Sequence, residues 1–187
     1  VKTFGATRAV DGVDLAIPRG CVYGVLGPNG AGKTTTIRLL ATLLRPDGGH
    51  ARVLGRDVVR EAAAVRRLVS LTGQFASVDT DLTAEENLRF VCSLYEVDRG
   101  RIDPALQRVG LDEVAHIRTG SFSQGMRQRL ALARCIMRSP DLVLLDEPYA
   151  GLDADSRVVV NDLLADTRQR GGTVLLASHE APPPHLV

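Results

Sequence analysis

The residues with the clearest chemical potential lie in one glycine-rich stretch, "GPNGAGKTT", residues 27–35. It matches the phosphate-binding pattern G-x-x-x-x-G-K-[ST], in which glycines let backbone N–H groups surround an anion. Lys33 adds a positive charge for the terminal phosphates of a nucleotide, and the hydroxyl of Thr34 suits Mg²⁺. We therefore expect the whole stretch to bind ATP: Gly27, Pro28, Asn29, Gly30, Ala31, Gly32, Lys33, Thr34 and Thr35.

Two adjacent carboxylates, Asp146 and Glu147, follow an apolar run. By itself such a pair is often only the start of a loop or a helix cap. Beside a phosphate-binding loop the two can divide the chemistry, with Asp146 holding Mg²⁺ directly or through water. Glu147 would then orient and polarise the attacking water as general base. The combination predicts hydrolysis of ATP to ADP and phosphate.

Length and charge narrow the class of protein. A chain of 187 residues that is 44% hydrophobic, with a formal charge of +1, is typical of one globular domain. The balanced charge gives no general attraction to nucleic acid, so we expect no nucleic-acid partner and anion binding only through local donors. Cys21, Cys92 and Cys135 lie far apart among apolar neighbours, which favours buried thiols over a disulfide or a metal site.

Alternating strands and helices are expected to position the reactive residues. The phosphate-binding loop follows a short apolar run, residues 21–27, and precedes apolar residues at helical spacing over 33–44. This helix should end near Arg45, because Pro46 restricts the residue before it. Further strands are expected over residues 67–73, 141–148 and 172–179. The last two are near-continuous apolar runs, which are typical of parallel strands buried on both faces.

Helical patterns fill the intervals between these strands. Thr83 and Glu86 have the spacing of a capping box at the start of a helix, and the pattern stays helical over residues 81–139. Asp153 is placed to cap the crossover helix between the last two strands. The predicted fold class is α/β, a P-loop NTPase core with a mainly parallel sheet flanked by helices and an inserted helical subdomain.

We expect a single domain over residues 1–187, truncated at both ends. Its nucleotide-binding core would comprise residues 1–80 and 140–180, and its helical subdomain residues 81–139. Three prolines, Pro182 to Pro184, exclude a regular helix near the end of the chain.

Over nearly its whole length the sequence resembles the ATP-binding cassette (ABC) ATPases, the motor subunits of ABC transporters. Residues 27–35 resemble the Walker A loop of that family, and residues 142–147 its Walker B strand with the catalytic glutamate. The resemblance implies a catalytic and metal-binding role for Gln74 as the Q-loop glutamine, and a catalytic role for His179 as the switch histidine. It also implies nucleotide contacts for Asp153, as the D-loop aspartate, and for Phe4, as the aromatic that stacks on adenine.

The stretch "SFSQGMRQRL", residues 121–130, occupies the position of the signature in that family. The resemblance implies that two cassettes pair head to tail, so that Ser123 and Gly125 contact the ATP held by the partner cassette. Taken alone, Ser123 would be assigned as a helix cap. Gln124 replaces the usual first glycine and Met126 the usual glutamine, so we expect altered rather than absent binding to the partner's nucleotide.

Residues 72–88 resemble the cassettes of prokaryotic drug-resistance exporters of the daunorubicin type. The predicted function is an ATPase subunit that powers export of drugs or other hydrophobic compounds. No apolar run reaches the roughly 18 residues of a membrane-spanning helix, so the permease would be a separate membrane chain. The cassette would be cytoplasmic, at the inner face of the cell membrane. Two alternatives stay open: a soluble cassette ATPase in translation or DNA repair, and a nucleotide binder with impaired hydrolysis.

Overall fold

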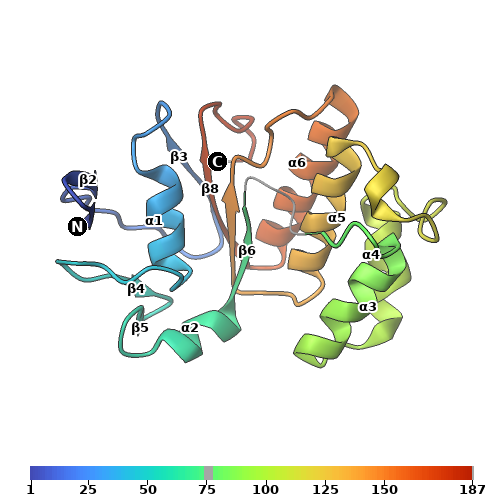
Figure 1. Ribbon diagram of the computed structural model, residues 1–187, viewed down its shortest axis with the longest axis horizontal. Helices are drawn as coiled ribbons and strands as arrows, with labels where there is room; N and C mark the ends of the chain where they lie inside the picture. The colour runs from blue at the N-terminus through green and yellow to red at the C-terminus, as the bar shows by residue number, and fades with distance from the viewer. Residues whose placement is uncertain (74–77, 187) are drawn as a thin grey trace.

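The centre of the molecule is a parallel sheet of four strands, in the order β3-β8-β7-β6 (Figure 1). The computed structural model describes residues 1–73 and 78–186. The strands are β3 (Val22–Leu26), β6 (Val69–Thr72), β7 (Leu142–Asp146) and β8 (Thr173–Ser178). All residues of β7 and β8 are buried. The predictions of strands over these apolar runs and of a mainly parallel sheet are confirmed.

Helices cover the sheet on both faces, so successive residues of one strand enter different cores (Figure 1). Leu144 of β7 packs in a cluster with Ile37 of α1 (Lys33–Leu40), whereas Leu145 belongs to the cluster that contains Leu163 of α6 (Ala154–Gln169). Continuous apolar strands are needed for such two-sided burial. The α/β fold class predicted from the sequence is therefore confirmed.

The register of the sheet brings the carboxyl ends of three strands to one edge. Leu26 of β3 pairs with Ser178 of β8, and Asp146 of β7 pairs with Ala177. The loops that follow β3, β7 and β8 therefore begin side by side. In parallel α/β sheets this edge is where ligands bind.

Between residues 81 and 139 the structure describes helices and no strand, apart from an isolated bridge between Thr83 and Arg118. The helices are α3 (Ala84–Tyr95), η1 (Arg99–Arg101), α4 (Ile102–Arg108), η2 (Thr119–Ser121) and α5 (Gln124–Ile136). The predicted capping box is present, because Thr83 accepts a bond from the N–H of Glu86 and the Glu86 carboxylate accepts one from that of Thr83.

Several short elements lie on the same side of the sheet as α1 (Figure 1). They are the antiparallel pair β1 (Lys2–Phe4) and β2 (Thr7–Val10), the pair β4 (Arg52–Val53) and β5 (Arg56–Asp57), and helix α2 (Ala62–Leu68). The sequence patterns did not predict any of them. Strands of two to four residues are too short to show a hydrophobic period.

Two expectations about local structure were wrong. The first helix ends at Leu40 instead of near Arg45, because Thr42 adopts a left-handed conformation with φ 62° and turns the chain early. Cys21 is half-buried instead of buried, whereas Cys92 and Cys135 are buried free thiols as expected. Within the described residues no helix is both long and apolar enough to cross a membrane.

Candidate nucleotide site

The glycine-rich loop joins β3 to α1, as its sequence predicts. Gly30 and Gly32 have φ values of 82° and 86°, a region that side chains rarely allow. A Cβ atom on Gly32 would lie 2.1 Å from the carbonyl oxygen of Ala9 in β2, so only glycine fits there. Pro28, Asn29, Gly30 and Ala31 are exposed, whereas Gly27, Gly32, Thr34 and Thr35 are partly buried. The loop is therefore open to solvent and leads its backbone directly into the N-terminus of α1.

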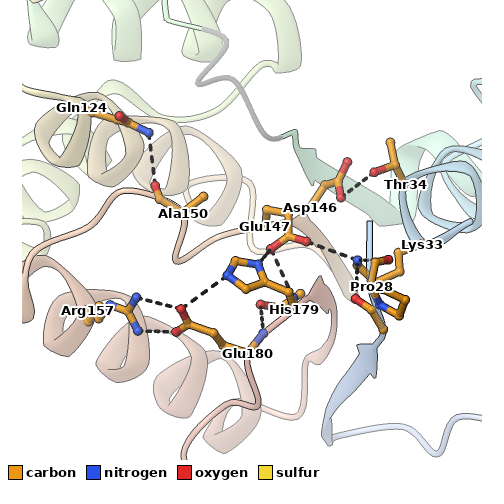
Figure 2. A network of polar contacts seen from close by, with 12 residues as sticks. Pro28, Lys33, Thr34, Gln124, Asp146, Glu147, Ala150, Arg157, His179 and Glu180 are labelled. Atoms are coloured by element: carbon orange, nitrogen blue, oxygen red, sulfur yellow. Dashed lines mark hydrogen bonds and ion pairs between the residues drawn. The ribbon is translucent and has the colours of Figure 1, made fainter. Parts of the chain in front are cut away.

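Lys33 begins α1 and is buried, with its ammonium group turned back into the loop (Figure 2). Its Nζ atom donates to the carbonyl oxygens of Gly27 at 2.7 Å and Pro28 at 3.1 Å. The same atom lies 3.5 Å from Oε1 of Glu147. The positive charge therefore stands at the centre of the loop, where an anionic phosphate could take the place of Glu147 as its partner.

Thr34 and Asp146 meet although they lie far apart in the sequence. The Thr34 hydroxyl donates to Oδ1 of Asp146 at 3.0 Å. Two neighbouring ligands of an octahedral Mg²⁺ ion with bonds of about 2.1 Å are about 3 Å apart, so this pair of hard oxygen donors fits such an ion. Burial raises the pKa of Asp146, and the bond from Thr34 opposes that rise. A divalent cation would offset the same desolvation of the carboxylate.

Among the described residues, no group of three or more His, Cys, Asp and Glu side chains could hold a metal by itself. An ion held at Thr34 and Asp146 would therefore take its other ligands from nucleotide oxygens and water, as Mg²⁺ commonly does at nucleotide sites.

Glu147 lies between Lys33 and His179 (Figure 2). Its backbone is left-handed, with φ 51°, and its N–H donates to the carbonyl of Ala177 at 2.8 Å. Its Oε2 atom lies 2.8 Å from Nδ1 of His179 and accepts a bond from the backbone N–H of His179 at 3.3 Å. A strained backbone at a non-glycine residue is typical of a site where side-chain placement matters. In this conformation the carboxylate of Glu147 contacts the ammonium group of Lys33 and the ring of His179.

Two residues that the sequence patterns did not single out extend this network. Glu180 follows His179 directly, and its Oε1 atom lies 3.4 Å from Nε2 of the His179 ring. Arg157 of α6 donates to both oxygens of Glu180, at 2.6 Å and 3.4 Å. The sequence did contain a signal for Glu180, because it is an acidic residue that directly follows His179. No signal pointed to Arg157, because only the packing of α6 brings it to β8.

The signature residues form a separate group at the start of α5 and α6. Ser123 caps α5 by accepting a bond from the N–H of Met126 at 3.2 Å, and Asp153 caps α6 by accepting one from that of Ser156 at 2.8 Å. A Cβ atom on Gly125 would lie 2.8 Å from Oγ of Ser156, so the two helix ends are in close contact. Hydrogen bonding to the side chain and the backbone N–H of Ser156 lowers the pKa of the Asp153 carboxyl group.

Gln124 is the first residue of α5, and its side chain lies against the turn before Asp153. Its amide Nε2 donates to the carbonyl of Ala150 at 3.2 Å. Position 124 is helical, a conformation that glutamine adopts without strain. In Figure 2 Gln124 and Ala150 lie well apart from Lys33 and Thr34. The structure thus brings together Lys33 with the carboxylates and His179, and leaves the signature residues away from their own loop.

Phe4 and Gln74 complete the predicted set. Phe4 lies on β1 with its ring half exposed, and the Nζ atom of Lys2 is 5.4 Å from the ring centre. Since β1 pairs with β2, and Ala9 of β2 contacts the glycine loop, Phe4 belongs to the small sheet beside that loop. Gln74 lies outside the described residues.

The sequence and the fold are similar to those of known proteins. The family model described as ABC transporter matches residues 10–150. The chain is 52% identical to the daunorubicin/doxorubicin resistance ATP-binding protein DrrA of Streptomyces peucetius, over 95% of this chain and 55% of that protein. It is 45% identical to the daunorubicin resistance ATP-binding protein DrrA3 of Streptomyces coeruleorubidus, over 95% of this chain and 57% of that protein. The chain thus spans about half the length of these curated relatives.

Among solved structures the fold is similar to a dimeric ATP-binding cassette in a post-hydrolysis state, bound to ADP and Pi. The two share 26% sequence identity with a TM-score of 0.83, over 92% of this chain and 80% of the other.

Proposed function

Because the chain belongs to the ABC transporter family, we propose that it binds ATP with Mg²⁺ and hydrolyses the ATP to power an exporter. One observation supports this most directly: Lys33, Asp146, Glu147 and His179 come from three separate segments of the chain and converge at one edge of the sheet. Such a convergence of a cation, a metal-binding pair and a carboxylate suits phosphoryl transfer to water.

Nucleotide binding would begin with an exchange of partners at Lys33. Its ammonium now faces Glu147 at 3.5 Å and two loop carbonyls. A terminal phosphate carries more negative charge than the carboxylate, so Lys33 would turn to it, assisted by the N–H groups at the start of α1. Mg²⁺ held at Thr34 and Asp146 would neutralise charge on the phosphates. Phe4 would stack on the adenine, and Gln74 would assist at the metal and the attacking water.

Release from Lys33 would free Glu147 to act on water. Its carboxylate would accept the proton of the attacking water as general base, while His179 holds the carboxylate from the other side at Nδ1. This division leaves metal binding to Asp146 and proton transfer to Glu147. The left-handed backbone at Glu147 directs the two neighbouring side chains to these different tasks.

The signature group would complete the site of a second cassette. Ser123 and Gly125 flank Gln124 at the start of α5, where the helix N-terminus favours an anion. Gln124 itself lies apart from Lys33 of the phosphate-binding loop (Figure 2). Head-to-tail pairing of two copies, or of this chain with a similar one, would bring each signature to the other's ATP. Asp153, at the adjacent start of α6, would lie at the same interface.

The export partner would be a separate membrane permease, which keeps the cassette at the cytoplasmic face of the membrane. An apolar surface suited to such a partner runs along α3, where Phe90, Leu94 and Tyr95 are each at least half exposed. It adjoins a cavity of about 260 Å³ beside β6. Three arginines line this cavity, namely Arg66, Arg134 and Arg138. Because no described residue that lines it is acidic, a permease segment with apolar and acidic side chains fits best. The names of the similar proteins suggest drugs as cargo.

Turnover by the purified chain tests the proposal. We expect ATP hydrolysis only with Mg²⁺, and a specific activity that rises with chain concentration, because two chains must pair to form each complete site. ATP binding without turnover at any concentration, with and without a co-expressed permease, would instead favour a nucleotide binder. Co-purification with ribosomes or DNA rather than with a membrane protein would favour a non-transport ATPase.

A further inference from the structure

The imidazole of His179 lies between two carboxylates (Figure 2). Nδ1 is 2.8 Å from Oε2 of Glu147, and Nε2 is 3.4 Å from Oε1 of Glu180. The His179 side chain is itself 52% exposed. Packing therefore cannot hold the ring in one orientation, and these two polar contacts must define it.

Glu180 is in turn fixed at three points. Arg157 binds both of its carboxylate oxygens, and the backbone N–H of Glu180 donates to the buried Ser178 hydroxyl at 3.1 Å. The bond from Arg157 is the main reason why the pKa of the Glu180 carboxyl group is lowered. A two-point arginine–carboxylate contact sets the angle of the carboxylate as well as its distance.

Arg157 is anchored on the rigid part of the fold. It belongs to the first turn of α6, and its guanidinium carbon lies 5.8 Å from the ring centre of Tyr149. Tyr149 is buried, and its hydroxyl donates to Asn161 of the same helix at 2.8 Å. A continuous series of contacts thus leads from α6 through Arg157 and Glu180 to His179, and from there to Glu147.

We infer that Glu180 and Arg157 are positioning residues for His179, and through it for the carboxylate of Glu147. Neither residue contacts the phosphate-binding loop in the described structure, so the effect falls on the chemical step rather than on nucleotide binding. The inference rests on the proposed hydrolysis at Glu147. It goes further by assigning Glu180 and Arg157 a role in placing His179. As a surface ion pair alone, the two residues would contribute little to the stability of the fold.

A set of three variants of the chain separates positioning from a merely structural ion pair. Glu180→Gln keeps the shape of the side chain but weakens its hold on His179. Arg157→Lys keeps the positive charge and serves as the conservative control. The exchange variant, Arg157→Glu with Glu180→Arg, restores an ion pair between α6 and the loop after β8. It places a cation next to His179.

We expect Glu180→Gln to lower kcat on the order of tenfold with little change in KM for ATP, because a displaced base mainly affects the chemical step. Arg157→Lys, which keeps the charge but not the two-point contact, should give a kcat between those of the parent and Glu180→Gln, and the exchange variant should stay as slow as Glu180→Gln. Recovery of the parent rate in the exchange variant would overturn the inference, since it would show that any ion pair suffices. A parent-like kcat in Glu180→Gln would overturn it as well.

Nitrogen NMR of the His179 ring provides a readout that is independent of turnover. The signals of His179 can be distinguished from those of the other three histidines by comparison with His179→Gln. The ring-nitrogen shifts of His179 should change in Glu180→Gln, while those of the other histidines stay as in the parent. Unchanged His179 shifts would contradict the inference even if Glu180→Gln were slow. If the parent chain itself does not hydrolyse ATP, the proposed function fails, and the NMR result still decides whether Glu180 holds His179. If Glu180→Gln does not fold, Arg157→Met is used in its place in both measurements, because it removes the side chain that holds Glu180.

Discussion

The phosphate-binding group and the signature group differ in how their polar side chains are satisfied. Around the loop, Glu147 is paired with Lys33 through one oxygen and with His179 through the other, and a ligand could replace Glu147 as the partner of Lys33. At the signature, Ser123 and Asp153 are bonded to the first turn of their own helices. Under the proposed function the first group would hold the reacting phosphate, whereas the second, at two helix N-termini, would become a site only against another cassette. Variants of the two groups should accordingly affect different steps.

The largest effect is expected from Lys33→Ala. The loop loses the only cation that the structure places within it, so tight ATP binding should be abolished. Calorimetry with Mg²⁺ and ATP measures the loss directly. An affinity equal to that of the parent chain would show that the loop does not hold the terminal phosphates, and the distinction between the two groups would fail.

Glu147→Gln should separate binding from chemistry within the loop group. The amide keeps the shape of the side chain, and Asp146 still offers its carboxylate to Mg²⁺, so ATP binding should persist. Turnover should fall by a factor on the order of 10² to 10⁴, because the general base is removed, and an ATP-bound dimer should accumulate. Phosphate release measured alongside ATP affinity tests both parts. Turnover within a factor of two of the parent would show that another residue acts as the base.

Ser123→Arg should affect the signature group alone. A long cation at the start of α5 is unfavourable next to the helix N-terminus and would block the approach of a second cassette. ATP binding by the monomer should match that of the parent, while ATP-dependent dimerisation, measured by light scattering in the Glu147→Gln background, should disappear. Loss of ATP binding by the monomer would mean that Ser123 acts on its own loop or on folding, and the two-cassette arrangement would have to be abandoned.

The smallest effect is expected from Asp153→Asn, measured as a function of pH. The pKa of Asp153 is lowered in the folded chain by its bonds to Ser156, so the ionised carboxylate stabilises the fold at neutral pH. This contribution is lost as the pH falls from the unfolded-state pKa of about 3.9 through the lower folded-state value. Urea denaturation should show a small stability deficit of the variant at pH 7 that vanishes at the acidic end. A deficit that is independent of pH would show that the charge of Asp153 is irrelevant to the cap.

Much of the site could be predicted from the sequence because it depends on local backbone chemistry. The glycine loop, the capping box at Thr83 and the cap at Asp153 each depend on residues within a few positions of one another. The carboxylates at 146 and 147 were recognisable because they end a buried apolar strand. The early end of α1 was missed because the left-handed Thr42 carries no strong sequence signal.

The sequence by itself determined which kind of fold would form and indicated the candidate residues of the nucleotide site, since strands and loops follow from local patterns of apolar residues and glycines. Only the tertiary structure decided how those residues meet. Thr34 reaches Asp146 across 112 positions of chain, and Lys33 faces Glu147, because the register of β3, β8 and β7 aligns their ends. The contacts of Arg157 with Glu180 and of Gln124 with Ala150 depend on how α6 and α5 pack, and no local pattern records that packing.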